Sequence, residues 1–461
     1  MTVATGNPGF LDDQQPTAMA RAGALNLLAR LATGAAALAL AILTTHVLSV
    51  HGRGLYVILT TTAGICVILL TAPSPVLVAD LVHARRDEAH LRGGMLALGV
   101  LSCVTLVIVA VVAGALGQSL PGAPFVQIAT AVTSGVLVYV VCEISLAQGT
   151  GNVTWVGLGE VLAALLPLLA SLVAAALGLA SVGVLILAWL VGALLTAALQ
   201  LGAALRRRSL ALDGALALAL GWLWRSRSIA FSNSALQLCA RIDVLVVSAV
   251  ISVSAAGVYS IPVALAANLL LFPRALITVT YRSIMISPPD DLARRLGATM
   301  RRCALLAATG GLLGVPLAAF TAGPIFGHPY AGIWQPLAIL VPGIAGWSIV
   351  ELLRHVLLTR FERQREVLLT AVGMTIANGV LAVVGSAAFG LDGAAASTTI
   401  TYVAAAIWMT RVCSLRLGVP ARRMYAPLRS DLFPIVRKNA NGGVTGSAPE
   451  QAAPGAGEPD A

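Results

Sequence analysis

Long apolar stretches follow one another along most of this sequence, separated by short polar segments. A helix that spans a membrane needs roughly 20 predominantly apolar residues. Hydrophobic residues make up 58% of the 461 positions and charged residues only 10%, too few charges to cover a soluble domain of this length. The sequence therefore predicts an all-α integral membrane protein with about twelve transmembrane helices. We expect them near residues 22–49, 55–80, 94–117, 124–147, 153–177, 181–204, 228–252, 255–280, 301–322, 332–357, 366–389 and 392–414.

The positive charges are distributed unevenly between the two sides of these expected helices. Of the 29 Lys and Arg residues, 25 fall at the N-terminus, in or beside the even-numbered loops, or in the C-terminal region. Under the positive-inside rule this places both termini and the even-numbered loops in the cytoplasm. The net charge of +10 is accounted for in this way, and no nucleic-acid partner is needed to explain it. A multi-pass protein of the plasma membrane is expected.

An internal repeat relates the two halves of the chain. Residues 47–58 read VLSVHGRGLYVI and residues 250–261 read VISVSAAGVYSI, with six of twelve positions identical. Both segments join the first expected helix of a half to its second. An even number of helices per half gives both halves the same orientation, so we expect two six-helix bundles in a parallel 6+6 repeat. The predicted parts are a cytoplasmic segment 1–21, a bundle 22–206, an interfacial linker 207–227 with Trp222 and Trp224, a bundle 228–414, and a basic, then disordered, tail 415–461.

Cysteine spacing and loop length argue against metal chemistry and against an enzyme. The six cysteines lie in or at the edges of expected helices without metal-like spacing, and they are interpreted as small buried side chains. We expect no metal site and no cofactor. The outer loops are a few residues long, which leaves little room for catalytic groups.

Several segments resemble the polysaccharide (oligosaccharidyl-lipid) flippases of the MATE-like superfamily, of the O-antigen and teichoic-acid exporter type. They are HVLSVHGRGLYVI at 46–58, RIDVLVVSAVISVSAAGVYSI at 241–261, GPIFGHPYAGIWQPLAILVPG at 323–343 and GLDGAAASTTITYV at 390–403. The resemblance implies export of a lipid-linked oligosaccharide from the inner to the outer leaflet. It also implies that the partners are the lipid-linked glycan, membrane lipids and polysaccharide assembly proteins.

Polar stripes on two expected helices are candidates for binding such a cargo. The first helix carries Asn26 and Arg30 on one face, and the seventh carries Asn233, Gln237 and Arg241 at i, i+4 and i+8. The two stripes occupy equivalent places in the two halves, so we expect both to line a central cavity. Arginine forks bind phosphate with bidentate geometry. An alternative left open is that these arginines only form ion pairs with acids between the bundles.

Four further charged residues have expected roles. Arg274 lies near the inner end of the eighth helix, where it binds cargo, anchors the helix or gates. Arg53 is expected in an outer loop, either attracting anionic cargo or acting as an ordinary loop charge. Asp243 and Glu160 lie inside helices and are candidates for ion coupling, because ionisable groups are costly in a membrane.

The leading hypothesis is a flippase that works by alternating access around a cationic cavity. The second is an ion-coupled exporter of cationic drugs from the same superfamily. It ranks lower because the deep charges include arginines and only 5% of residues are aromatic. A sugar importer of the major facilitator type ranks third, since ADLVHARRDEAHLRG at 79–93 lacks the usual motif of that class. A membrane enzyme ranks last.

Overall fold

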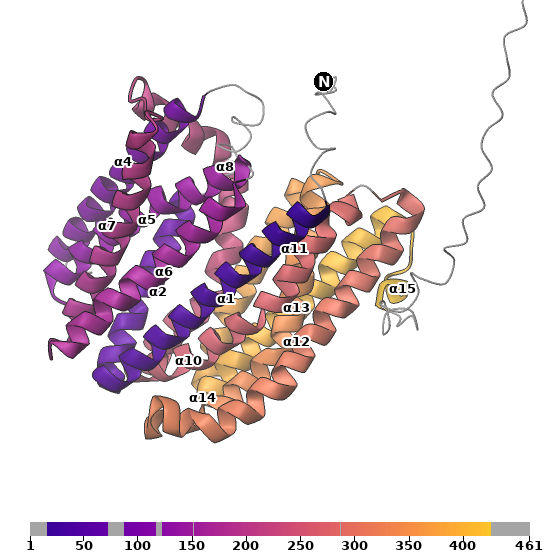
Figure 1. Ribbon diagram of the computed structural model, residues 1–461. Helices are drawn as coiled ribbons and strands as arrows, with labels where there is room; N and C mark the ends of the chain where they lie inside the picture. The colour runs from indigo at the N-terminus through magenta and orange to yellow at the C-terminus, as the bar shows by residue number, and fades with distance from the viewer. Residues whose placement is uncertain (1–15, 72–86, 117–121, 151, 286, 426–461) are drawn as a thin grey trace, which may run out of the picture. The chain divides into compact units, whose positions relative to one another are not determined.

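Helices account for the architecture of the residues that the computed structural model describes, which are 16–71, 87–116, 122–150, 152–285 and 287–425. No β-strand occurs within these ranges, and all of them belong to one unit, Met1–Tyr425. The elements (Figure 1) are α1 (Pro16–Val47), α2 (Val50–Leu70), α4 (Glu88–Ala115), α5 (Pro124–Gly149), α6 (Val153–Ala176), α7 (Val182–Arg206), α8 (Ala215–Cys239), α9 (Ile242–Val250), α10 (Val253–Leu269), α11 (Leu271–Met285), α12 (Pro289–Phe326), the short 3₁₀ helix η2 (His328–Ile333), α13 (Trp334–Thr359), α14 (Gln364–Leu417) and α15 (Ala421–Tyr425).

Membrane-spanning length is common among these helices. In the described ranges, ten helices are long and apolar enough to cross a membrane, or eleven if the bent pair Phe231–Cys239 and Ile242–Val250 counts as one span. The prediction of an all-helical, multi-pass membrane protein is confirmed. The number twelve and the cytoplasmic termini stay predictions.

The helix α14 is counted as one of these ten helices, although it is a hairpin with two arms. Gly390 adopts φ 62° and ψ −137°, a conformation outside the helical region. The two arms then run side by side, because Ser397 Oγ donates a hydrogen bond to the Leu381 carbonyl oxygen at 2.6 Å. This turn lies between the helices expected at 366–389 and 392–414.

The repeated segments have the same local structure in both halves. Ser49 caps α2 by accepting a hydrogen bond from the Gly52 amide at 3.1 Å, and Ser252 caps α10 by accepting one from the Ala255 amide at 3.0 Å. A serine side chain at this position satisfies an amide that the helix leaves unpaired. Each half therefore starts its second helix at an equivalent residue.

The helices α2 and α10 cross at a pair of glycines. A Cβ atom on Gly54 would lie 1.9 Å from the Val253 carbonyl oxygen, and one on Gly257 would lie 2.8 Å from the Val50 carbonyl oxygen. Gly54 and Gly257 are repeat mates, as are Val50 and Val253. We call this crossing the seam. It joins the two halves of the chain, and each glycine approaches the repeat mate of the valine that the other glycine approaches.

Two expected helices are interrupted. The seventh bends by 49° between α8 and α9, and the eighth is divided at Leu270 between α10 and α11. Pro273 lies in the first turn of α11, where its missing amide proton and its ring oppose continuation of the preceding helix. Hydropathy alone does not reveal such breaks, because both arms are apolar.

The predicted linker 207–227 contains both a connection, 207–214, and the start of the helix α8. The helix α8 begins after Gly214 and runs without interruption to Cys239, so the expected boundary at 227 lies inside a helix. Trp222 is fully buried against Gly94 of α4, whereas Trp224 is exposed. The other predicted boundaries stay predictions, and most of the tail 415–461 and of the segment 1–21 falls outside the described residues.

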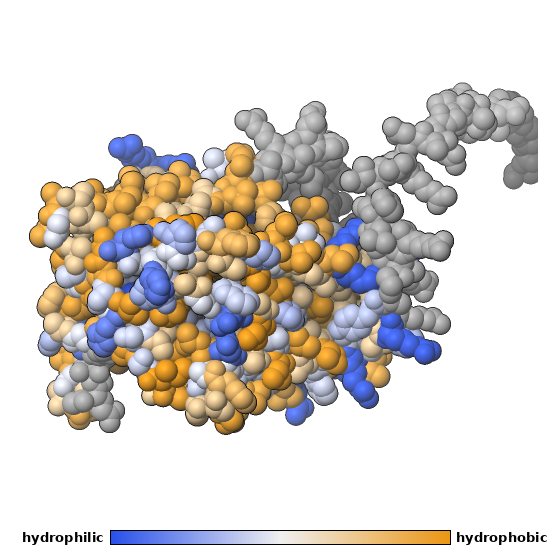
Figure 2. Space-filling view, turned by 90° about the horizontal axis from the view of Figure 1, so that it is seen from below, coloured by the Kyte–Doolittle hydropathy of each residue, from blue (hydrophilic) through white to orange (hydrophobic). Residues whose placement is uncertain are grey.

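Apolar side chains dominate the surface of the described helices. Examples with exposed side chains are Val279, Leu312 and Phe320. Hydrophobic residues also cover most of the face shown in Figure 2. A surface of this kind is suited to the hydrocarbon of a lipid bilayer.

Candidate functional site

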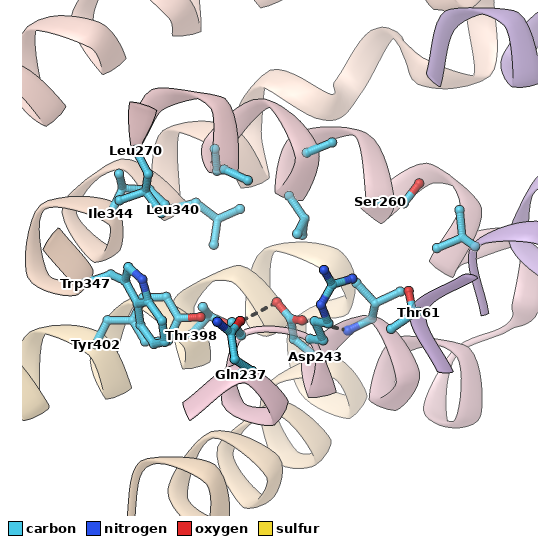
Figure 3. A pocket seen from close by; sticks show the side chains of 18 of the residues that line it. Thr61, Gln237, Asp243, Ser260, Leu270, Leu340, Ile344, Trp347, Thr398 and Tyr402 are labelled. Atoms are coloured by element: carbon cyan, nitrogen blue, oxygen red, sulfur yellow. Dashed lines mark hydrogen bonds between the residues drawn. The ribbon is translucent and has the colours of Figure 1, made fainter. Parts of the chain in front are cut away.

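A cavity of about 350 Å³ is lined by residues of both halves (Figure 3). Thr61 of α2 comes from the first half, and the second half contributes residues of α8, α9, α10, α11, α13 and α14. In Figure 3, Trp347 and Tyr402 lie at one end of the cavity, Ser260 and Thr61 at the other, and Gln237 and Asp243 between them. This volume falls in the range of small-molecule sites.

Arg241 owes its place in the cavity to the break between α8 and α9. It is the residue before α9, with φ −132° and ψ −12°, and its side chain is exposed to the cavity. Its guanidinium reaches α2, since a Cβ atom on Gly64 would lie 3.1 Å from Arg241 Nη1. Within the described ranges, the structure gives this guanidinium no hydrogen bond or ion pair. The cavity therefore contains a cationic group that is available to a ligand.

Asp243 has the opposite environment, although it is only two residues further on. Its side chain is 2% exposed. It accepts hydrogen bonds from the Val244 amide at 2.8 Å, the Tyr259 hydroxyl at 3.0 Å and the Thr398 hydroxyl at 3.2 Å. Asn378 lies beside it, with Oδ1 3.4 Å from Thr398 Oγ1 and Nδ2 donating to the Cys239 carbonyl. This group of oxygen atoms could hold a proton or a small cation.

Arg274 lines the cavity and forms an ion pair across α11 and α13. Its Nε lies 3.0 Å from Glu351 Oε2 and 3.2 Å from Oε1. One turn along α13, Arg354 donates to Asn233 Oδ1 at 2.9 Å. Asn233 is thus held in this network rather than in the cavity lining. It lies one turn before Gln237 on the unbroken helix α8, and the cavity lining includes Gln237 but does not extend to Asn233. The expectation that Asn233 lines the cavity together with Gln237 and Arg241 is corrected.

The stripe on the first helix is placed elsewhere. Arg30 is half-buried on α1, which packs against α6, and it is not among the residues that line the cavity. The side chain of Asn26 lies outside the described residues. Glu160 is half-buried on α6 and does not line the cavity either. The structure does not bring Arg30 and Arg241 together in this cavity, and their roles stay predictions.

The placement of Arg53 in a loop is wrong. Because Ser49 caps α2 at Val50, Arg53 lies inside the helix, and its side chain is 3% exposed. It is buried in the seam and does not line the cavity.

Sequence reasoning missed the aromatic wall of the cavity. The Trp347 and Tyr402 rings pack with centroids 4.6 Å apart and planes at 43°. Tyr402 and Thr398 fall in the segment 390–403 that carried part of the family resemblance, which was the only available signal. A single tryptophan in an apolar helix is otherwise indistinguishable from a packing residue.

No family model and no curated protein matches this chain. Solved structures do match. A multidrug resistance MATE family transporter of the MOP superfamily, in an inward-facing conformation, superposes with a TM-score of 0.65 at 13% identity, covering 87% of this chain and 100% of that chain. The chain has the fold of a MATE transporter.

Two other neighbours agree with this assignment of the fold. A MOP superfamily transporter from Pyrococcus furiosus gives a TM-score of 0.64 at 13% identity, covering 87% of this chain and 95% of that chain. A mutant of the Vibrio cholerae MATE transporter VcmN gives 0.60 at 13% identity, covering 88% and 97%. These neighbours are transporters and not enzymes. Together with the apolar helices, they indicate a multi-pass membrane protein.

Proposed function

We propose that this protein is a flippase that moves a lipid-linked oligosaccharide or polysaccharide precursor from the inner to the outer leaflet of the plasma membrane. The MATE fold supports membrane transport. The glycan cargo rests on the sequence resemblance, and the charge of the cavity supports an anionic cargo such as a polyprenyl pyrophosphate.

The observation that carries this proposal is the guanidinium of Arg241 in the cavity. Placing a charged side chain in a membrane helix costs roughly 2.5–3.5 kcal/mol on insertion scales. The nearby acids do not neutralise it by direct contact: Asp243 accepts three other hydrogen bonds, and Glu351 pairs with Arg274. A pyrophosphate would offer the guanidinium of Arg241 charged oxygen atoms that can accept two parallel hydrogen bonds, the geometry that arginine prefers.

Asp243 is the residue that we assign to ion coupling. As a carboxylate it accepts hydrogen bonds from Tyr259 and Thr398, which lie on α10 and α14. Binding a proton or a cation there would change the contacts between these helices. Since a ligand shifts a conformational equilibrium by its differential affinity, such a change could drive alternation between two arrangements of the halves.

The test replaces Arg241 and measures export of the lipid-linked glycan in cells with matched protein levels. We expect Arg241→Ala to reduce the rate about tenfold or more, because hydrogen bonds to a charged group are worth about 1.5–3 kcal/mol. Arg241→Lys keeps the charge and should retain part of the activity. The control is Arg295→Ala, at an exposed arginine on α12. Normal export by Arg241→Ala would overturn the assignment.

An ion-coupled multidrug exporter is the second candidate function. One solved neighbour is a multidrug resistance MATE family transporter, and the cavity contains the Trp347–Tyr402 pair, which suits flat organic cations. The Pyrococcus furiosus neighbour, by contrast, is described as having a binding pocket of reverse polarity that suggests a different function.

Drug efflux in a pump-deficient cell separates the two candidates. The flippase proposal expects no efflux of cationic dyes. Efflux that disappears in Trp347→Ala and persists in Arg241→Ala would favour the multidrug exporter over the flippase.

A further inference from the structure

Arg53 is a buried cation at the contact between the two halves. It projects from α2, one residue before Gly54, at which α2 crosses α10. Its side chain is 3% exposed. A charge at this position needs compensation, because removing an arginine from water costs several kcal/mol unless its donors are satisfied.

Acceptors from both halves satisfy the donors of Arg53. In its own half, Nη1 donates to the Ala41 carbonyl oxygen at 2.8 Å and to the Thr44 hydroxyl, both on α1. Across the seam, Nε donates to the Gly257 carbonyl oxygen at 3.2 Å and Nη2 to the Ser260 hydroxyl at 3.2 Å, both on α10. The guanidinium also lies over the face of the Tyr330 ring of η2, with Arg53 Cζ 5.9 Å from the ring centroid.

None of these contacts, within the residues described, is made with a carboxylate. This matters for reversibility. Opening the Arg53 contacts exposes one guanidinium and several neutral groups, all of which water can hydrate. Arg53 therefore holds the halves together through bonds that are strong when closed and replaceable when open.

The position of these bonds connects them to the cavity. Ser260 accepts the hydrogen bond from Arg53 and also lines the cavity. In Figure 3 Ser260 lies with Thr61 at the end of the cavity away from Trp347. The seam thus closes the cavity at this end.

We propose that Arg53 is a latch that keeps this end of the cavity closed and must release α10 for the cavity to open there. The proposal rests on alternating access as described under Proposed function. It assigns Arg53 a positioning role between the halves rather than the cargo-binding role expected from the sequence.

The test measures the separation of the halves at the seam end without any cargo. Spin labels are attached at Leu179→Cys, between α6 and α7, and at Phe389→Cys, at the turn of α14; both side chains are exposed. The background has its six native cysteines replaced by alanine, and the protein is in lipid nanodiscs. Double electron–electron resonance then reports the populations of closed and open distances.

We expect a short distance in the unaltered background and a long-distance population in Arg53→Gln. Loss of a hydrogen bond to a charged group corresponds to about a tenfold or larger rise in the open-to-closed ratio. Ser260→Ala, which keeps the arginine and removes one acceptor across the seam, should give a smaller shift in the same direction. It also serves if Arg53→Gln does not fold.

The control removes another buried arginine, one that lies within one half. Arg92 contacts Glu143 at 3.4 Å between α4 and α5, so the double variant Arg92→Gln/Glu143→Gln should leave the distance unchanged. The latch is refuted if Arg53→Gln and Ser260→Ala both keep the short distance, or if the control shifts as far as they do. Because no cargo is present, that result leaves the Arg241 export test unaffected.

Discussion

At the scale of single residues, Arg241 and Asp243 show how one backbone break creates two environments. The turn between α8 and α9 presents Arg241 to the cavity, and the first turn of α9 points Asp243 toward Tyr259 and Thr398. Residues two apart on a helix already point to different faces, and the break between α8 and α9 adds a bend of 49° at this place. The cationic and acidic functions are therefore separated within one turn of chain.

Asp243→Asn should uncouple transport from its driving ion without preventing folding. The amide has the shape of the carboxyl group, and its oxygen can still accept hydrogen bonds from Tyr259 and Thr398, while its NH2 group takes the place of the oxygen that accepts from the Val244 amide. It does not take up a proton or balance a cation. We expect gradient-driven transport in proteoliposomes to fall about tenfold or more, in line with the loss of a charged interaction. Asp291→Asn, at a partly exposed acid on α12, is the control. Unchanged dependence on imposed proton and sodium gradients would show that coupling lies elsewhere.

The cost of intramembrane charge singled out Arg30, Glu160, Arg241, Asp243 and Arg274 from the sequence, and the last three of these line the cavity, while their roles stay predictions. Gln237 followed from its spacing to Arg241. The same spacing predicted Asn233, which bonds to Arg354 one turn before the cavity lining begins, because periodicity gives the face of a helix and not the length of helix that a cavity covers. Trp347 and Tyr402 could not be found, since their roles depend on which of many apolar side chains face the cavity.

At the scale of elements, local signals determine where the second helix of each half begins. The serine caps at Ser49 and Ser252 start α2 and α10, and Gly54 and Gly257 let their backbones touch. Hydropathy placed the start of the second helix at residue 55, five residues too late, and this error put Arg53 in a loop. Most other spans were located well, because a stretch of about 20 apolar residues is a strong signal.

Gly54→Ala should disturb the seam, because its Cβ would lie 1.9 Å from the Val253 carbonyl oxygen. Steric overpacking of this kind costs about 1–3 kcal/mol. Gly202→Ala on α7 is the matched change, since no atom lies within 4 Å of its Cβ position. We expect the apparent melting temperature of the detergent-solubilised protein to fall for Gly54→Ala only. Equal melting temperatures for the two variants would mean that the helices do not cross this closely.

At the scale of the whole molecule, composition and the repeat predicted the fold class. They could not predict how the halves meet, because apolar side chains face lipid on one side of a membrane helix and other helices on the other side. The distribution of arginines predicts the orientation in the membrane.

Single-cysteine labelling tests that orientation in a background without native cysteines. Arg208→Cys, after α7, should react with a membrane-impermeant maleimide only after permeabilisation. Leu179→Cys, at the other end of α7, should react in intact cells. The reverse pattern would place both termini outside and would turn the proposed direction of transport around.

The repeat mate of Arg53 is Ala256, which is fully buried. A molecule assembled from two first halves would bring two guanidiniums to the same crossing, and their repulsion would force it apart. In a molecule assembled from two second halves, alanine would face alanine at this crossing, and no guanidinium would join the two halves by hydrogen bonds. Among the six of twelve positions at which the repeated segments differ, Arg53 and Ala256 are therefore the pair that leaves a single guanidinium at the crossing.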